Sequence, residues 1–188
     1  MLKDEVNKAL KVLQDGGIIL YPTDTIWGIG CDATNTDAVK KIYALKQREE
    51  SKSMIILVDT DNKLQSYITE VPDIAFDLIE YAENPLTLVM PGARNISPAL
   101  IAADGSVGIR VSNHPFCKQL IQRLRKPLVS TSANISGRPA PEYFSKIDEE
   151  IINGVDYVID IDRYSTEIKK PSTIMRLSPN GSFEFIRR

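Results

Sequence analysis

Amphipathic segments alternate with short apolar runs along almost the whole chain, and this alternation constrains the fold most strongly. Residues 6–13 place apolar side chains three and four positions apart, as in a helix, and residues 18–21 form an apolar run typical of a buried strand. In residues 107–111 apolar side chains alternate with a glycine and Arg110, so a strand there would present Arg110 on the opposite face. Because several later strands follow short turns, we expect a single α/β domain over residues 1–188, with a twisted mixed sheet flanked by helices.

The same patterns predict the remaining elements. Helices are expected from a cap at Asn35 or Thr36 to Leu45 and over residues 73–82, 116–124 and 145–152. Strands are expected over residues 54–58, 86–90, 128–130, 157–161, 173–177 and 183–186. The loop 136–141 contains proline and glycine and lacks apolar anchors, so we expect it to be the most mobile element.

The composition is that of a globular protein and excludes several classes. Apolar residues make up 43% of the 188 residues and charged residues 26%, and no apolar run approaches the ~20 residues that a membrane span needs. The first residues lack the basic and apolar regions of a signal peptide, so we expect a cytoplasmic protein. The net charge of −2 argues against a protein whose main task is to grip nucleic acid, although it does not exclude a local basic patch.

The cysteines and the single histidine offer little for metal or redox chemistry. Cys31 and Cys117 have no CxxC spacing, and we expect both to be buried reduced thiols. His114 cannot build a multi-histidine metal site, and Pro115 after it indicates a turn into a helix. We therefore predict no metal site made by protein side chains.

Residues 28–33 match the dinucleotide-binding pattern G-x-G-x-x-A. That site needs its glycines between a strand and the N-terminus of the helix that meets the pyrophosphate. Here the residues that can cap a helix, Asn35 and Thr36, come later. The pattern therefore does not favour a dinucleotide site.

Two polar segments that lie far apart in the chain look like the two halves of a polyphosphate clamp. Residues 46–53 carry Lys46, Arg48 and Lys52, and residues 130–134 supply uncharged hydroxyl and amide groups. Cations at a helix end have a simpler explanation, because they stabilise the helix by ~0.3–1 kcal/mol through its macrodipole. The buried strand expected directly afterwards nevertheless favours a fixed geometry for these cations. We therefore predict a nucleotide site without a Walker loop, provided that both segments line one cavity.

Two of these polar features also have simpler explanations. Arg110 would be an exposed strand residue paired with a surface carboxylate, a contact worth ~0–1 kcal/mol. Residues 130–134 would form an ordinary turn whose side chains bond to local backbone. From the sequence alone both explanations stay open.

Together with further motifs, these segments resemble the family of YrdC-type threonylcarbamoyl-AMP synthases. The matching motifs lie in order along the chain, as Tyr21-Pro22-Thr23-Asp24-Thr25, Gly28 with Gly30, Lys46 with Arg48, Lys52 and Ser53, Gly108-Ile109-Arg110-Val111, Ser132-Ala133-Asn134, and Pro171-Ser172-Thr173-Ile174. The resemblance implies a YrdC/RibB-like fold and the short form of the family, without an additional C-terminal domain. It also implies that ATP, L-threonine and bicarbonate are combined into threonylcarbamoyl-adenylate and pyrophosphate.

The resemblance also assigns residues to roles. Arg48 and Lys52 would be the catalytic cations at the ATP phosphates. The other positions that correspond to ATP contacts are Lys46, Ser106, Ser132, Asn134, Ala140 and Arg187. The positions that correspond to threonine contacts are Thr25, Leu57, Arg110, Ser130 and Ser172, where backbone contact would suffice for Leu57 and Ser130. One departure is Glu49, which stands where family members commonly have proline and makes the cationic loop locally less positive.

The sequence fits a mechanism without an enzyme nucleophile. A carbamate formed from threonine and bicarbonate already carries the anionic oxygen that would attack ATP, and the chain has no Ser/His/Asp set. Mg²⁺ would bridge the ATP phosphates and keep water ligands. The product would pass to other proteins that modify an adenosine next to the tRNA anticodon, so a downstream tRNA-modifying complex is the expected partner.

Two other functions stay open. In an RNA-binding module of the same fold, the cations of residues 46–52 would track a phosphate backbone, with an affinity that falls steeply with salt and ignores threonine. A paralogue would retain nucleotide binding but lack the threonine reaction. Amino-acid specificity, oligomeric state and direct tRNA contact do not follow from the residues.

Overall fold

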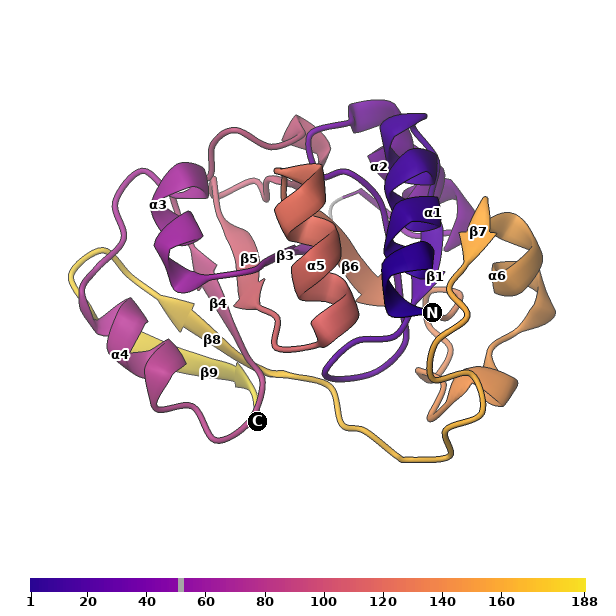
Figure 1. The fold of residues 1–188 in the computed structure, drawn as a ribbon. Helices are drawn as coiled ribbons and strands as arrows, with labels where there is room; N and C mark the ends of the chain where they lie inside the picture. Colours follow the sequence, from indigo (N-terminus) through magenta and orange to yellow (C-terminus); the bar gives the residue numbers. More distant parts are fainter. Residues whose placement is uncertain (51–52) are drawn as a thin grey trace.

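The computed structural model describes residues 1–50 and 53–188, which form a β-sheet with helices on both faces (Figure 1). The strands are β1 (Ile19–Tyr21), β2 (Gly28–Gly30), β3 (Ile55–Val58), β4 (Leu86–Met90), β5 (Val107–Val111), β6 (Leu128–Ser132), β7 (Tyr157–Val158), β8 (Thr173–Leu177) and β9 (Phe183–Arg187). The helices are α1 (Leu2–Gln14), α2 (Thr36–Leu45), α3 (Leu64–Tyr67), α4 (Ile74–Glu80), α5 (Pro115–Leu124) and α6 (Glu149–Gly154), with short 3₁₀ turns at Asp61–Lys63, Pro98–Leu100 and Phe144–Lys146.

Within the described part of the chain the strands form one nine-stranded sheet in the order β7-β1-β2-β6-β3-β5-β4-β8-β9. β1 is parallel to β7, β3 to β5 and β4 to β8, whereas the other neighbouring pairs are antiparallel. This arrangement confirms the predicted mixed sheet. The strands that follow short connections pair antiparallel, as in β8 and β9, because a tight turn reverses the chain direction.

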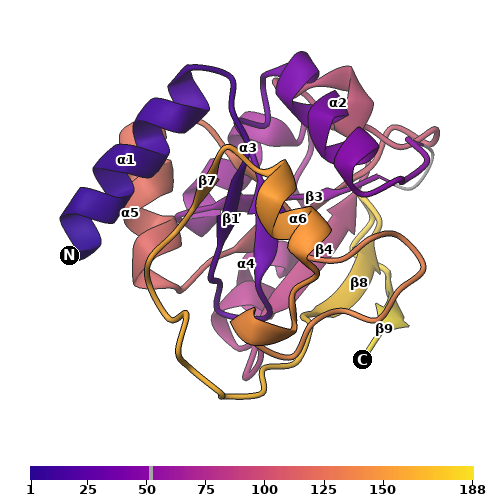
Figure 2. The same cartoon turned by 90° about the vertical axis from the view of Figure 1, so that its right-hand side faces the viewer.

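The predicted apolar spacing explains how the helices pack. α1 and α5 lie side by side on one face of the sheet, and α2 covers the opposite face (Figures 1 and 2). α1 buries Val6, Ala9 and Leu13, which recur every three or four residues. α2 begins where predicted, because the Asn35 side chain accepts a hydrogen bond from the amide of Ala38 at 3.1 Å.

β2, which lies within residues 28–33, was not among the strands expected from the sequence. Gly28–Gly30 is itself a strand between β1 and β6. A Cβ atom on Gly30 would lie 2.3 Å from the Val129 carbonyl oxygen and 2.7 Å from the Tyr21 ring, so only glycine fits. The glycines therefore allow close strand packing. They do not form the strand-to-helix turn that a dinucleotide-binding site needs.

Other differences from the sequence prediction concern short elements. The 3₁₀ turn and single-turn helix over residues 61–67 were not predicted, because one turn is too short to show a periodicity. The expected strand 157–161 pairs only over Tyr157–Val158, and the expected helix 145–152 is a 3₁₀ turn followed by α6. The loop 136–141 has an apolar anchor after all, since Pro141 is buried; its mobility stays a prediction.

The cysteines and the histidine occupy structural positions. Cys31 and Cys117 are both buried and unpaired, which confirms the prediction, and burial raises the pKa of the Cys117 thiol to about 12. His114 directly precedes α5, and its Nε2 lies 3.2 Å from a carboxylate oxygen of Asp162. Among the described residues no helix is long and apolar enough to cross a bilayer.

Candidate active site

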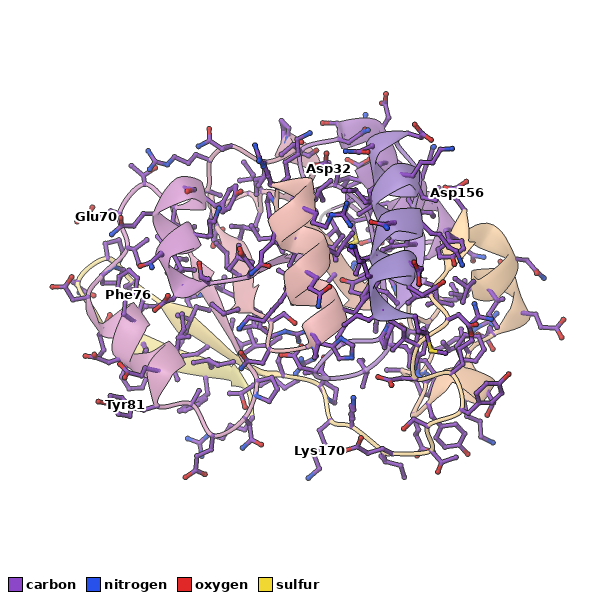
Figure 3. The ribbon with its side chains drawn as sticks, in the orientation of Figure 1. Asp32, Glu70, Phe76, Tyr81, Asp156 and Lys170 are labelled. Atoms are coloured by element: carbon purple, nitrogen blue, oxygen red, sulfur yellow. The ribbon has the colours of Figure 1, made fainter. Side chains whose placement is uncertain are left out.

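The two polar segments singled out from the sequence meet at one cavity of about 260 Å³. Its lining includes Thr25, Arg48, Ser53, Arg110, Ser130, Ser132, Ala140, Ser172 and Arg187. A larger groove of about 380 Å³, beside Tyr81 at the surface of α4, contains none of the predicted site residues (Figure 3). Size alone would therefore not select this cavity, whereas the sequence motifs point to it; that it is the functional site stays a prediction.

Sheet topology explains why the segments converge. β6 runs antiparallel to β3, and Ser130 pairs with Ile55. Residues that precede β3 therefore lie beside residues that end β6. Arg110 pairs with Leu57 further along β3, so it lies deeper in the sheet than Ser53. We call Thr25, Arg110 and Ser172 the Arg110 end of the cavity, and Arg48, Ser53 and Ser132 the Arg48 end.

Arg110 is the central charged group of its end. It is only 3% exposed, and its Nη2 lies 3.3 Å from Oδ1 of Asp24. Among the described residues its guanidinium makes no hydrogen bond, and its Nε is buried without a partner. A buried donor left unpaired costs ~1–3 kcal/mol, so this group is suited to bind an anionic ligand. The burial also excludes the simpler explanation of a surface strand residue.

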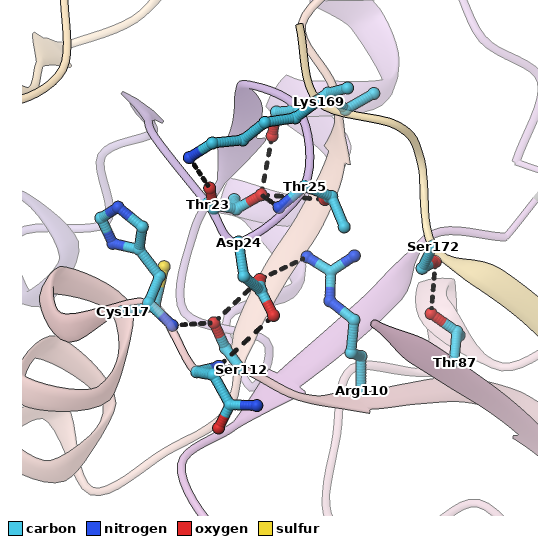
Figure 4. A network of polar contacts seen from close by, with 12 residues as sticks. Thr23, Asp24, Thr25, Thr87, Arg110, Ser112, Cys117, Lys169 and Ser172 are labelled. Carbon is cyan, nitrogen blue, oxygen red and sulfur yellow. Dashed lines mark hydrogen bonds and ion pairs between the residues drawn. The ribbon is translucent and has the colours of Figure 1, made fainter. Parts of the chain in front are cut away.

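Hydroxyl groups fixed by hydrogen bonds surround this guanidinium (Figure 4). The Ser172 and Thr87 hydroxyls lie 2.8 Å apart, and Thr87 is the residue opposite Arg110 in the β4–β5 pair. The Thr25 hydroxyl lies 2.9 Å from that of Thr23. Sequence reasoning missed Thr87 because it sits in an otherwise apolar strand, where its hydroxyl is the only signal.

The Arg48 end is built by the turn that follows α2. Gln47 has a left-handed φ of 50°, and the Arg48 amide bonds to the Tyr43 carbonyl, which ends the helix and turns the chain toward β3. Arg48 Nη2 then donates to the Ser53 carbonyl oxygen at 3.2 Å. Burial lowers the pKa of Arg48 below its ordinary value. Lys52, the second predicted catalytic cation, lies outside the described residues.

Lys46 is held inside the protein. It is 1% exposed, and its Nζ donates to the Ser132 carbonyl, to the Asn134 carbonyl at 2.5 Å and to Oδ1 of Asn134 at 3.2 Å. These acceptors match the three hydrogens of an ammonium group. Burial nevertheless lowers the pKa of Lys46 to about 7. Neither Lys46 nor Asn134 belongs to the cavity lining given above, and their contacts with ATP stay predictions.

Two further predicted residues lie away from the cavity lining. Ser106 directly precedes β5, and its hydroxyl donates to the carboxylate of Asp104. Leu57 is fully buried and could reach a ligand only through its backbone, as expected. Of the remaining predicted residues, Ser130 and Ala140 line the cavity, but their ligand contacts also stay predictions.

The cavity is electrostatically suited to anions. Three arginines line it, Arg48, Arg110 and Arg187, whereas the described lining contains no Asp or Glu. Arg187 donates to the Ser172 carbonyl at 2.8 Å, and burial together with the nearby charge of Arg110 lowers its pKa. The donors available are guanidinium and hydroxyl groups. They fit phosphate and carboxylate ligands better than a metal ion bound directly by the protein.

Comparison with known proteins shows which family this chain belongs to. The family model Sua5_yciO_yrdC, described as telomere recombination, matches residues 11–188. The chain belongs to the Sua5/YciO/YrdC family. A relative in this family from Pseudoalteromonas translucida (strain TAC 125), named threonylcarbamoyl-AMP synthase, is 36% identical over 155 residues, which cover 81% of this chain and 83% of the relative.

Solved structures of the Sua5/YciO/YrdC family have the same fold. E. coli YciO superimposes with a TM-score of 0.85 at 22% identity, and the match covers 100% of this chain and 90% of YciO. P. abyssi Sua5, solved in complex with L-threonine, superimposes with a TM-score of 0.81 at 26% identity. That match covers 92% of this chain and 50% of Sua5, so this chain spans about half the length of the P. abyssi protein.

Proposed function

We propose that this protein is a threonylcarbamoyl-AMP synthase, which forms L-threonylcarbamoyladenylate and pyrophosphate from ATP, L-threonine and bicarbonate. One observation carries the proposal: the buried guanidinium of Arg110, without a hydrogen bond among the described residues, shares a cavity with Arg48. One cavity thus offers a carboxylate site and a phosphate site. The relative named threonylcarbamoyl-AMP synthase and the threonine complex of P. abyssi Sua5 support this function over an RNA-binding module.

The reaction has two steps. The threonine amine attacks the carbon of bicarbonate and forms an N–C bond, while the C–OH bond breaks and the departing hydroxide takes a proton from the nitrogen to leave as water. A carbamate oxygen then attacks the α-phosphorus of ATP while the bond to pyrophosphate breaks. The protein supplies no nucleophile in this scheme; it holds the reactants in line and places cations where negative charge develops.

Each end of the cavity has its own role in this scheme. Arg48 and Lys52 bind the phosphates, and the other positions proposed to contact the nucleotide are Lys46, Ser106, Ser132, Asn134, Ala140 and Arg187. Arg110 grips the threonine carboxylate at two points, since a guanidinium is a planar fork. Thr25 and Ser172 bind the other polar groups of the amino acid, and Leu57 and Ser130 contribute backbone contacts.

Mg²⁺ would arrive with ATP. The lining offers hydroxyls but no carboxylate among the described residues, which fits an ion held by phosphate oxygens and water. The ion would neutralise part of the triphosphate charge. Arg48 and Lys52 would neutralise the remainder.

The direct test is a synthesis assay with purified protein, ATP, labelled bicarbonate and each amino acid in turn, with any adenylate identified by mass. Threonylcarbamoyl-adenylate formed only with threonine supports the proposal. Calorimetry of ATP binding with and without threonine separates the alternatives. Mutual enhancement of binding is expected here, ATP binding alone would indicate a paralogue, and binding of neither would indicate an RNA module. A single catalytic domain, a cytoplasmic location and supply of product to a tRNA-modifying complex stay predictions.

A further inference from the structure

Asp24 is a carboxylate beside the cavity that the proposed roles do not use. It lies between β1 and β2, and its side chain is 12% exposed. Its Oδ1 accepts from the Ser112 hydroxyl at 3.1 Å, and its Oδ2 accepts from the Asn113 amide at 3.3 Å. Both donors follow β5, the strand that carries Arg110. The carboxylate is therefore fixed by the same chain segment as the guanidinium that it faces.

The geometry places Asp24 behind Arg110 relative to the ligand space. In Figure 4 the guanidinium of Arg110 lies between Asp24 on one side and Ser172 on the other. Ser172 lines the cavity together with Arg110, but Asp24 does not belong to that lining. Asp24 therefore acts on a ligand only through Arg110.

The charge balance of the cavity indicates what the contact between Asp24 and Arg110 does. ATP brings several negative charges into a space with three arginines, and an uncompensated Arg110 would attract phosphates as well as carboxylates. The Asp24 carboxylate offsets the charge of Arg110 and holds its Nη2 in place. The remaining donors of the guanidinium are then held in one orientation toward a ligand, and their attraction for polyanions is reduced.

We propose that Asp24 is a positioning and specificity residue: it reserves Arg110 for the single carboxylate of the amino acid and keeps that guanidinium from binding phosphates. This inference rests on the proposed function. It adds a residue that sets which class of anion, monocarboxylate or polyphosphate, enters the Arg110 end.

The test compares Asp24→Asn with Asp32→Asn. Asparagine retains an oxygen for Ser112 but removes the charge facing Arg110. Asp32 is also buried and ion-paired, with Lys126 at 2.7 Å, and it lies at the opposite side of the molecule from Lys170, whose neighbour Pro171 lines the cavity (Figure 3). Asp32→Asn therefore removes a buried carboxylate from an ion pair without touching the cavity, although its partner Lys126 is half exposed.

For Asp24→Asn the KM for threonine should rise about tenfold to a hundredfold, because small misplacements of a binding group have effects of this size. The KM for ATP should stay within about twofold, and added pyrophosphate should become a competitive inhibitor against threonine. Asp32→Asn should leave both KM values unchanged. A folded Asp24→Asn enzyme with the wild-type KM for threonine, or with both KM values raised together, overturns the inference.

Ser112→Ala covers the case in which Asp24→Asn does not fold. It removes one hydrogen bond to Asp24 and leaves the charges intact, so the KM for threonine should rise about threefold without a change in the KM for ATP. An unchanged KM for threonine would contradict the inference. Wild-type protein that neither binds threonine in calorimetry nor forms the adenylate would instead refute the proposed function, so the two failures are distinct.

Discussion

The two ends of the cavity are built in different ways. At the Arg110 end, Arg110 on β5, Thr87 on the neighbouring β4 and Ser172, just before β8, are buried, and the Thr87 and Ser172 hydroxyls bond to each other. At the Arg48 end, the groups come from the turn after α2 and from the end of β6, and Lys46 joins these two segments. The buried groups of one end belong to the sheet or adjoin it, whereas the two segments of the other end are joined by the contacts of Lys46. Fixed geometry suits recognition of a small amino acid, and joined segments suit a larger phosphate chain.

Arg48→Ala should have the largest effect on this comparison, because it removes a cation from the end proposed to receive the charge of the leaving pyrophosphate. The rate of threonine-dependent pyrophosphate release should fall about a thousandfold, as when a transition-state donor is removed. Arg123→Ala is a charge-matched control on the exposed surface of α5. Near-normal release from Arg48→Ala would remove Arg48 from the proposed mechanism.

Arg110→Lys should separate the two ends. Lysine keeps the charge but loses the planar fork, so the KM for threonine should rise about a hundredfold, the order expected when a buried charged contact is broken. ATP binding measured by calorimetry should be unchanged. An equal loss of ATP affinity would show that the two ends do not act separately.

Lys46→Met tests the contacts that join the two segments of the Arg48 end. Methionine fills similar space but leaves three oxygens of Ser132 and Asn134 without their donor. The value of kcat/KM for ATP should fall about tenfold or more through displacement of Ser132. Threonine binding should change little, and a fall in threonine affinity alone would contradict the assignment of Lys46 to this end.

Lys46 should also shape the pH dependence of stability. Its pKa falls from 10.5 to about 7 on folding, so the unfolded chain binds the proton more tightly than the folded one. Stability from this group is lowest below pH about 7 and rises toward pH about 10.5, where both states are neutral. Chemical denaturation of the wild type and Lys46→Met at pH 6 to 9 measures the free energy of unfolding of each. The free energy of the wild type should rise with pH relative to that of the variant, and a constant difference would contradict the lowered pKa.

Thr87→Val should have the smallest effect. Valine has the same shape as threonine but removes the hydroxyl that bonds to Ser172. The free energy of unfolding should fall by about 1 kcal/mol, and the KM for threonine should rise about threefold because Ser172 loses a partner. Equilibrium unfolding and steady-state kinetics provide the two measurements. No change in KM would show that β4 contributes stability alone.

The sequence predicted those parts of the molecule whose signal is local. The spacing of apolar residues predicts the helix of residues 6–13 and the strand of residues 107–111. The order of the polar segments predicted one cavity. Thr87 gave no such signal, and Asp24, although it stands in the motif of residues 21–25, gave no sign of its pairing with Arg110. Both roles depend on a neighbour across the sheet or the loop, which one chain segment does not reveal. Lys46 was expected among the ATP contacts, yet its buried ammonium is held by oxygens 86 and 88 residues away.

The ammonium of Lys46 also has a consequence for synthesis on the ribosome. A nascent chain that has emerged only as far as β5 contains Lys46 but none of the oxygens that receive its hydrogens. Until residues 128–134 arrive, burying this lysine would leave its charge unpartnered, which is strongly unfavourable. The proposed nucleotide site should therefore form late in synthesis, in one step, once residues 128–134 are present. ATP would then bind the complete protein and bind incomplete nascent chains only weakly.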